Sequence, residues 1–175
     1  MRKVLPFKYP EITSWTWTAA TFAVLENYKN AEPWLYNNFV QLFCEKYDNW
    51  VSVHYIPHLD VFLNNPFFRS ALINREIISA FQIDIVDFVK KNIDLGYYVY
   101  CKVDEGYICR ENRFLHELVI FGYDDETEGF NIADFTLTKS QKYTFSFTTY
   151  ENLKKAYESV SVKEDDMQDG VGGNG

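Results

Sequence analysis

The chain has 175 residues, of which 47% are hydrophobic and 18% aromatic, the size and apolar content of one ordinary domain with a packed core. Its 17 lysines and arginines face 25 aspartates and glutamates, so its net charge is −8. This balance argues against nucleic acids and anionic membranes as partners, because both attract clustered cations.

The N-terminal segment has two cations but no apolar run after them, unlike a signal peptide, and no stretch of about 18 apolar residues predicts a membrane span. Cys44, Cys101 and Cys109 lack the spacing of a disulfide framework or a zinc site. We therefore expect a cytoplasmic protein with free thiols, without a metal ion or cofactor.

The first half of the chain reads mainly as helices. Apolar residues spaced by four predict a helix over 17–28, with hydroxyl groups near Thr16 available to cap its first turn. A second helical pattern runs from Pro33 to residue 43. Residues 51–56 alternate as in a short strand, and 69–93 contain two weaker helical patterns that Gly96 closes.

After Gly96 the apolar period changes to two, which is typical of strands. The segments with this pattern are 97–103, 118–123, 130–135 and 142–147. Thr148 or Thr149 then caps a last short helix. The pattern predicts an α+β fold, with an N-terminal helical half packed on a C-terminal antiparallel sheet. We expect a single domain over 1–160 and a disordered acidic and glycine-rich tail over 161–175.

One histidine has a neighbour suited to catalysis. His116 opens the strand that runs to Tyr123, and the next strand returns beside it and ends at Asp134. A carboxylate beside an imidazole fixes its tautomer and orients it as a base. The alternative is a structural histidine with a satisfied hydrogen bond.

The same segment resembles a known family. The run 115–125, Leu-His-Glu-Leu-Val-Ile-Phe-Gly-Tyr-Asp-Asp, followed by 130–134, Phe-Asn-Ile-Ala-Asp, is similar to the histidine and aspartate strands of papain-like cysteine peptidases. The C39-like group and the butirosin-biosynthesis H-protein N-terminal domain are the most similar in pattern. Residues 96–108 resemble that family's preceding strand and its Asp-x-x-Tyr stretch. The resemblance implies a papain-like fold with His116 and Asp134 in the active site.

The family carries its nucleophilic cysteine at the start of the first long helix. Aligning residues 16–26 on that helix places Thr16 at the cysteine, and Pro10 stands near the position of the family's oxyanion-hole glutamine. A threonine hydroxyl does not ionise as a thiol does and must give its proton to His116 during attack. The alternatives for the nucleophile are Cys109, next to a cation in a loop, and Ser14.

The resemblance implies an acyltransferase-type, or amide- or thioester-cleaving, enzyme that acts on a carrier-protein-bound acyl or aminoacyl substrate in natural-product biosynthesis. The roles implied are Thr16 as nucleophile, His116 as base and acid, and Asp134 as orienting residue. An acyl or peptidyl carrier protein is the expected partner, and it would dock on a local basic patch such as Lys90-Lys91 or Lys154-Lys155. The missing cysteine and glutamine favour the alternative, a catalytically degenerate module of the same fold that binds a peptide or small molecule.

Overall fold

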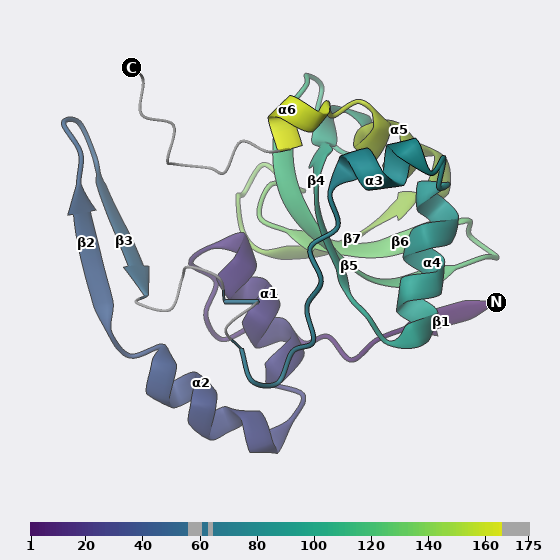
Figure 1. The fold of residues 1–175 in the computed structure, drawn as a ribbon. Coiled ribbons are helices and arrows are strands. Elements are labelled where there is room, and N and C mark those ends of the chain that lie inside the picture. The colour runs from purple at the N-terminus through teal and green to yellow at the C-terminus, as the bar shows by residue number, and fades with distance from the viewer. Residues whose placement is uncertain (56–60, 63–64, 166–175) are drawn as a thin grey trace. The chain divides into compact units, whose positions relative to one another are not determined.

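A computed structural model describes the chain except for residues 56–60, 63–64 and 166–175. The chain forms two compact units. The sheet unit consists of Met1–Leu5 and Leu72–Gly175, and the hairpin unit of Pro6–Ala71. Each combines helices with antiparallel strands, so the protein is of mixed α+β class (Figure 1).

The sheet unit is built on a curled antiparallel sheet with β5 at its centre. Its strands are β1 (Arg2–Val4), β4 (Val99–Asp104), β5 (Leu115–Asp124), β6 (Gly129–Asp134) and β7 (Thr144–Thr149). β6 pairs with one edge of β5 and with β7, while β4 and β1 follow one another along the other edge of β5. The four strands expected after Gly96 are therefore present, and β1 is an addition that the sequence pattern did not indicate.

A β-bulge interrupts the pairing of β5 with β6. Ile120 faces Ile132 and Gly122 faces Asn131, so Phe121 is an extra residue on β5. The carbonyl of Phe121 accepts a hydrogen bond from Leu5 N at 2.8 Å, which satisfies the backbone where the ladder shifts. Because side chains alternate between faces, the extra residue reverses the faces of β5 relative to β6 beyond this point.

The described part of the sheet unit contains several helices, of which the two longest bury apolar residues against this sheet. The helices are α3 (Arg75–Ala80), α4 (Ile85–Leu95), α5 (Tyr150–Glu158) and α6 (Val162–Asp165), with a 3₁₀ turn η3 (Glu105–Tyr107). Asp84 caps α4 through the N–H groups of Val86 and Asp87, and Gly96 closes it with φ 89°, a conformation that glycine adopts most readily. The expected cap of α5 is Thr149, which accepts from Asn152 N. The core residues that these elements share are Leu5, Ile85, Val89, Ile93, Val103, Leu118, Ile120, Tyr123, Phe130, Ile132, Leu137, Leu153 and Ala156.

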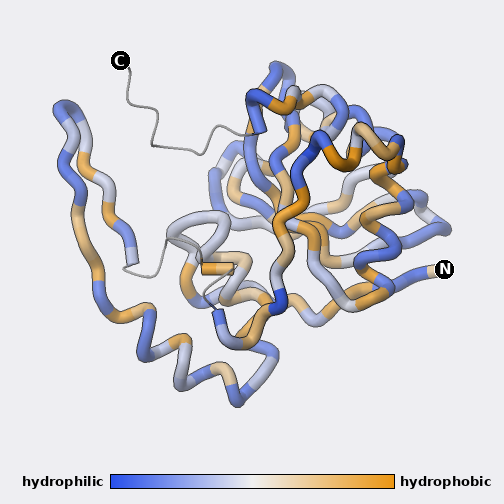
Figure 2. Tube along the Cα trace, in the orientation of Figure 1, coloured by the Kyte–Doolittle hydropathy of each residue, from blue (hydrophilic) through white to orange (hydrophobic). Residues whose placement is uncertain are grey.

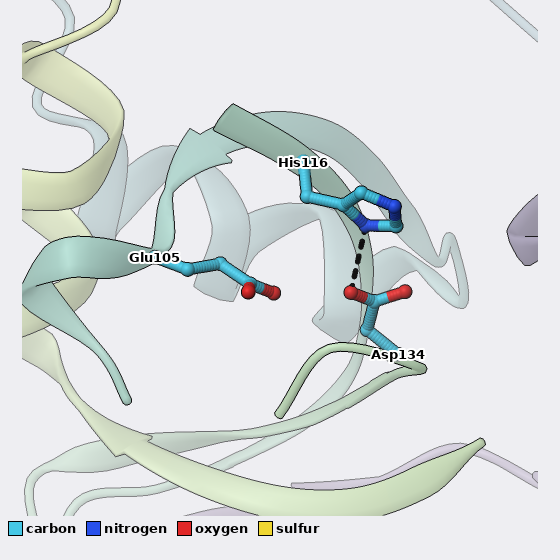
Figure 3. Close-up of side chains that lie close together, drawn as sticks. All are labelled: Glu105, His116 and Asp134. Carbon is cyan, nitrogen blue, oxygen red and sulfur yellow. Dashed lines mark hydrogen bonds and ion pairs between the residues drawn. The ribbon is translucent and has the colours of Figure 1, made fainter. Parts of the chain in front are cut away.

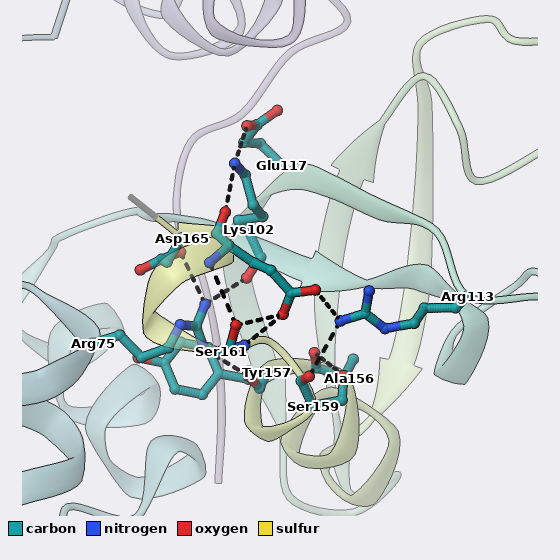
Figure 4. A network of polar contacts seen from close by, with 10 residues as sticks. Arg75, Lys102, Arg113, Glu117, Ala156, Tyr157, Ser159, Ser161 and Asp165 are labelled. Atoms are coloured by element: carbon teal, nitrogen blue, oxygen red, sulfur yellow. Dashed lines mark hydrogen bonds and ion pairs between the residues drawn. The ribbon is translucent and has the colours of Figure 1, made fainter. Parts of the chain in front are cut away.

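A polar network holds α6 against the sheet unit (Figure 4). The buried guanidinium of Arg75 donates to Tyr157 O at 2.6 Å, to Lys102 O at 2.9 Å and to Asp165 Oδ1 at 3.1 Å. Arg113 pairs with Glu164 at 2.7 Å. Residues at the start of the segment expected to be a disordered tail are thus helical and held by Arg75 and Arg113. Residues 166–175 lie outside the described part of the chain.

The hairpin unit contains α1 (Thr16–Leu25), a 3₁₀ turn η1 (Lys29–Ala31), α2 (Glu32–Asn38) and a two-stranded hairpin of β2 (Leu42–Lys46) with β3 (Val51–Tyr55). Its apolar core comprises Phe22, Leu25, Ala31, Leu35, Phe39 and Val61. The apolar and polar segments of both units can be followed along the chain in Figure 2. Nearly every residue of α1 is buried, as its high apolar content predicts.

The helical pattern expected from Pro33 to residue 43 is wrong in its second part. α2 ends at Asn38, whose side-chain amide donates to Trp34 O at 2.8 Å, and Leu42 already begins β2. The ladder with β3 decides the conformation of 42–46, because it gives these residues backbone hydrogen bonds that a short helix end would not.

Within the described part of the chain, every helix falls short of the length and apolar character that crossing a bilayer requires.

Candidate functional site

His116 and Asp134 lie in direct contact on the sheet. His116 is the second residue of β5 and Asp134 the last residue of β6, and Nδ1 of His116 lies 2.8 Å from Oδ2 of Asp134 (Figure 3). Asp134 is fully buried, whereas 27% of the His116 side chain is exposed. The hydrogen bond expected from the sequence is thus present, and its catalytic role stays a prediction.

The β-bulge explains why the two side chains meet. Val119 faces Ala133, so extending the register by one residue places Asp134 opposite Leu118. His116 is two residues from Leu118 and therefore shares its face of the sheet, as a diagonal neighbour of Asp134. Without the extra residue Phe121, Asp134 would be level with Val119 and point to the face opposite His116.

The contacts of Asp134 fix the tautomer of the imidazole. The same oxygen, Oδ2, also accepts from the backbone N–H of Thr136 at 3.3 Å and contacts the Thr136 hydroxyl. A carboxylate can only accept, so Nδ1 of His116 carries a proton. Nε2 is then the nitrogen left to exchange a proton with a substrate, as in a catalytic histidine.

Glu105 and Thr136 complete the cluster, and the sequence interpretation did not include them. Glu105 opens the η3 turn directly after β4 and is fully buried, and its Oε1 lies 2.5 Å from the Thr136 hydroxyl. In Figure 3 the carboxylate of Glu105 points toward the His116–Asp134 pair. The available signals were an acidic residue at the end of an apolar strand and a threonine two residues after Asp134, the spacing of a local side-chain-to-backbone bond.

Burial and mutual charge shift the pKa of each group in the cluster. Burial, opposed by the Thr136 hydrogen bond and assisted by Asp134, raises the pKa of Glu105 to about 7. Burial opposes charge on His116, but its hydrogen bond to Asp134 and the surrounding negative charges outweigh burial and raise its pKa to about 9. Burial likewise opposes ionisation of Asp134, yet His116 and Thr136 hold its pKa below the usual range. The cluster at neutral pH therefore centres on an imidazolium–carboxylate pair.

Glu105, His116 and Asp134 also offer atoms of the types that bind metal ions, all within 4.8 Å of one another. The same atoms are already joined by hydrogen bonds, directly or through Thr136. A cation would have to replace the protons that hold this network together. These hydrogen bonds are sufficient to explain why the imidazole and the two carboxylates lie so close together.

The structure places the expected nucleophile on the helix that the sequence indicated. Thr16 is the first residue of α1 and is buried in the hairpin unit, while His116 and Asp134 belong to the sheet unit. The cap position is occupied by Trp15 without a side-chain hydrogen bond, so the expected hydroxyl cap of this helix is not formed. The role of Thr16 stays a prediction.

Cys109 is a poor candidate for the nucleophile. Its sulfur lies 3.9 Å from Oε2 of Glu105, and desolvation together with that carboxylate raises the pKa of the thiol to about 11 despite Arg110 beside it. Arg110 does lower this pKa, but burial and Glu105 outweigh its effect. Ser14 is exposed and lies in the hairpin unit two residues before α1.

A second serine–histidine contact occurs on β3. Ser52 Oγ lies 2.5 Å from Nε2 of His54, and Oε2 of Glu45 lies 3.6 Å from that same nitrogen. A catalytic triad needs the acid and the hydroxyl on different ring nitrogens and a reachable hydroxyl. Ser52 is only 4% exposed, so this contact has the features of a structural hydrogen bond.

Comparison of the chain with protein-family models, with curated proteins and with solved structures gives no match. The resemblance to papain-like peptidases therefore depends on the residues of 96–158 and of the first helix.

Proposed function

We propose that the chain is a papain-like domain of the acyltransferase type, or one that cleaves amides or thioesters, acting on an acyl or aminoacyl group bound to a carrier protein in natural-product biosynthesis. The observation that carries the proposal is the hydrogen bond from Nδ1 of His116 to the buried Asp134, with Nε2 as the second ring nitrogen of a half-buried imidazole. The same two residues carry the resemblance.

The proposed reaction uses Thr16 as the nucleophile. Its oxygen forms a bond to the thioester carbonyl carbon while its proton passes to Nε2 of His116. The carbon–sulfur bond then breaks, and the carrier's thiol leaves with that proton. An amine or water opens the resulting threonine ester, giving its proton to Nε2, which returns it to the threonine oxygen.

The charge state of His116 sets the pH at which such a mechanism works. A general base must be neutral, and the pKa of His116 is raised to about 9 because Asp134 and its neighbours outweigh burial. The proposed reaction should therefore accelerate as pH rises from neutral to about 9.

The same charge state favours the second candidate, a degenerate module that binds a peptide or small molecule. An imidazolium that is hydrogen-bonded to a buried carboxylate can have a structural or ligand-binding role without catalysis. Together with a threonine at the expected cysteine position, it describes a papain-like site that holds a ligand.

The basic pairs expected to dock a carrier protein are mostly engaged within the sheet unit. Lys90 pairs with Asp125 at 2.6 Å. Lys154 and Lys155 pair with Asp84 and Glu151, at 2.5 and 2.6 Å. A carrier protein would have to compete with these carboxylates, which favours a weak, salt-sensitive complex.

The variant Thr16→Cys tests whether Thr16 and His116 form one site. A thiol beside the imidazole and the helix N-terminus should have a pKa below its free value of about 8.5 and be alkylated rapidly near neutral pH. The effect should disappear in Thr16→Cys/His116→Ala. Ser14→Cys, two residues away, is the matched control, and the native cysteines are followed by mass spectrometry. Equal alkylation rates for all three proteins would contradict the proposed site.

Activity then separates the two candidate functions. If the native protein transfers or hydrolyses an acyl group from carrier-bound thioesters, Thr16→Ala should reduce the rate by on the order of a thousandfold or more. Undiminished turnover in Thr16→Ala would exclude the hydroxyl mechanism. An assembled site in Thr16→Cys without native turnover on these substrates would support the binding module.

A further inference from the structure

We propose that Glu105 is a positioning residue of the His116 site, which holds a proton and passes its effect through the Thr136 hydroxyl to the carboxylate of Asp134. The proposal deepens the proposed function and rests on it where it concerns catalysis. It identifies a hydrogen-bonded chain of four side chains, Glu105–Thr136–Asp134–His116, in place of a histidine–aspartate pair. Figure 3 draws all of them except Thr136.

The argument begins with the number of hydrogens. The Thr136 oxygen is 2.5 Å from Oε1 of Glu105 and is also in hydrogen-bond contact with Oδ2 of Asp134. A hydroxyl carries one hydrogen and can donate it to only one of two carboxylates. The second contact is a hydrogen bond only if a carboxyl group donates to the threonine oxygen. One of the two acids therefore holds a proton.

The other contacts identify which acid this is. Oδ2 of Asp134 faces two further donors, Nδ1 of His116 and the backbone N–H of Thr136, so Asp134 is the acceptor at the centre of the network. Glu105 is fully buried, and its cationic neighbour Arg110 lies 3.6 Å away, beyond a normal hydrogen bond. The proton thus belongs to Glu105, which donates to Thr136, which donates to Asp134.

The electrostatics agree with this assignment. Burial is the main reason that the pKa of Glu105 is raised to about 7, and the nearby charge of Asp134 adds to it. The titratable and charged groups that face Glu105 are His116 on β5, Asp134 on β6, and Cys109 and Arg110 after η3. Glu117 and Tyr143 act on its neighbours His116 and Asp134. Arg110 is too distant to hydrogen-bond the Glu105 carboxylate, so burial dominates.

The protonation state of Glu105 controls the imidazole. While Glu105 is protonated, the chain of donors ends on one carboxylate, and His116 faces a single negative charge. When Glu105 ionises, two carboxylates contend for the hydroxyl hydrogen and a second negative charge lies near His116, which raises its pKa. While it is protonated, Glu105 spares His116 a second negative charge; above about pH 7, where it ionises, its charge adds to the raised pKa of His116.

The test is an NMR titration of the His116 ring in the full chain, which reads the network whether or not the protein turns over a substrate. In the native protein, His116 should show two inflections, one near pH 7 from Glu105 and one near pH 9 of its own. Glu105→Gln keeps a neutral side chain able to donate to Thr136. It should remove the inflection near pH 7 and lower the pKa of His116.

Glu111→Gln is the matched control, since Glu111 is an exposed glutamate in the loop between η3 and β5. It should leave both inflections in place. An equal drop in the pKa of His116 in both variants would overturn the proposal, because it would mean a general charge effect. So would a native His116 with one inflection only, or a Glu105 carboxyl carbon that titrates near its ordinary value of 4.5.

Thr136 provides an independent pair of variants. Thr136→Ser keeps the hydroxyl and should keep the inflection near pH 7. Thr136→Val has nearly the same shape but no oxygen to accept from protonated Glu105, so the Glu105 inflection should move to lower pH. Identical titrations of the Ser and Val variants would overturn the role of the hydroxyl. The two proposals can fail separately. If the native protein shows no acyl transfer but the titrations are as expected, the proposed function is contradicted and the hydrogen-bonded network is supported.

Discussion

At the scale of single residues, Asp134 has the largest influence on the site. It is fully buried, and one of its oxygens accepts from His116 and from the backbone of Thr136. A buried carboxylate with several donors is stabilised in its charged form and in turn stabilises a positive imidazole. The raised pKa of His116 therefore depends on the charge of Asp134 more than on the shape of its side chain.

Asp134→Asn isolates that charge. The amide has nearly the same volume but no charge, so we expect the pKa of His116 to fall from about 9 toward its ordinary value of about 6.5, since only Glu117 and Glu105 then oppose burial. An acyl-transfer rate, if present, should fall by on the order of a thousandfold because the tautomer is no longer fixed. NMR titration of the ring measures the shift. Asp87→Asn, on an exposed position of α4, serves as the control, and a His116 that still titrates near 9 in Asp134→Asn would refute the argument.

At the scale of elements, the β-bulge in β5 brings the site together. It depends on a close approach of three strands at Gly122, where a Cβ atom would lie 2.9 Å from Lys3 O on β1 and 3.0 Å from the Asn131 side-chain oxygen on β6. A side chain there must push one backbone away. The bulge in turn decides which face Asp134 occupies.

Gly122→Ala should therefore disturb both stability and the site. We expect a loss of about 1–3 kcal/mol in the free energy of unfolding and a lower pKa of His116, because the shift in β5 weakens its contact with Asp134. Gly96→Ala is the control at the end of α4, where a Cβ meets nothing within 4 Å and only the positive φ of 89° is strained. It should lose about 1 kcal/mol without any change in His116. Urea unfolding and the ring titration measure the two effects, and an unchanged His116 in Gly122→Ala would show that the bulge does not control the pair.

The sequence predicted the positions of helices and strands better than the pairing of the strands and the contacts between them. Alternation and turn residues located β4 to β7 because a half-buried strand needs that pattern, and α4 was marked by its apolar stripe and Gly96. The predicted helix runs on to residue 43 although Leu42 begins β2, because a short apolar run fits either period. The bulge at Phe121 and the pairing of β1 depend on contacts between distant strands, which no local pattern encodes. Glu105 was missed for the same reason: its partner Thr136 is 31 residues away.

At the scale of the whole molecule, the buried cluster makes folding take up protons. Glu105 has its pKa raised from 4.5 to about 7, chiefly by burial, and that of His116 is raised from 6.5 to about 9 against the effect of burial. Two partly exposed acids shift the other way: Lys90 lowers the pKa of Asp125 to about 2, and hydrogen bonds from Ser161 lower that of Glu164 to about 2. Their influence is confined to pH values below about 4.5, so from there to pH 9 the folded state binds more protons than the unfolded state.

The free energy of unfolding should therefore decrease as pH rises from about 4.5 to 9. The slope of stability with pH is proportional to the protons bound by the unfolded state minus those bound by the folded state, and here that difference is negative. The stabilisation from His116 is complete below pH 6.5 and is lost as pH rises through about 9, a change of up to about 3 kcal/mol. The growing negative charge of a chain that already carries −8 acts in the same direction.

Two variants separate the contributions by their pH windows. His116→Gln should flatten the stability curve between about pH 6.5 and 9, and Glu105→Gln should flatten it between about 4.5 and 7, because each removes one of the groups that bind a proton on folding. Urea unfolding at half-unit steps of pH measures the curves, with Glu111→Gln as the control for loss of an exposed charge. If the free energy of unfolding of the native protein rises from pH 6.5 to 9, His116 is neutral in the folded state. That result would contradict the imidazolium–carboxylate pair of His116 and Asp134.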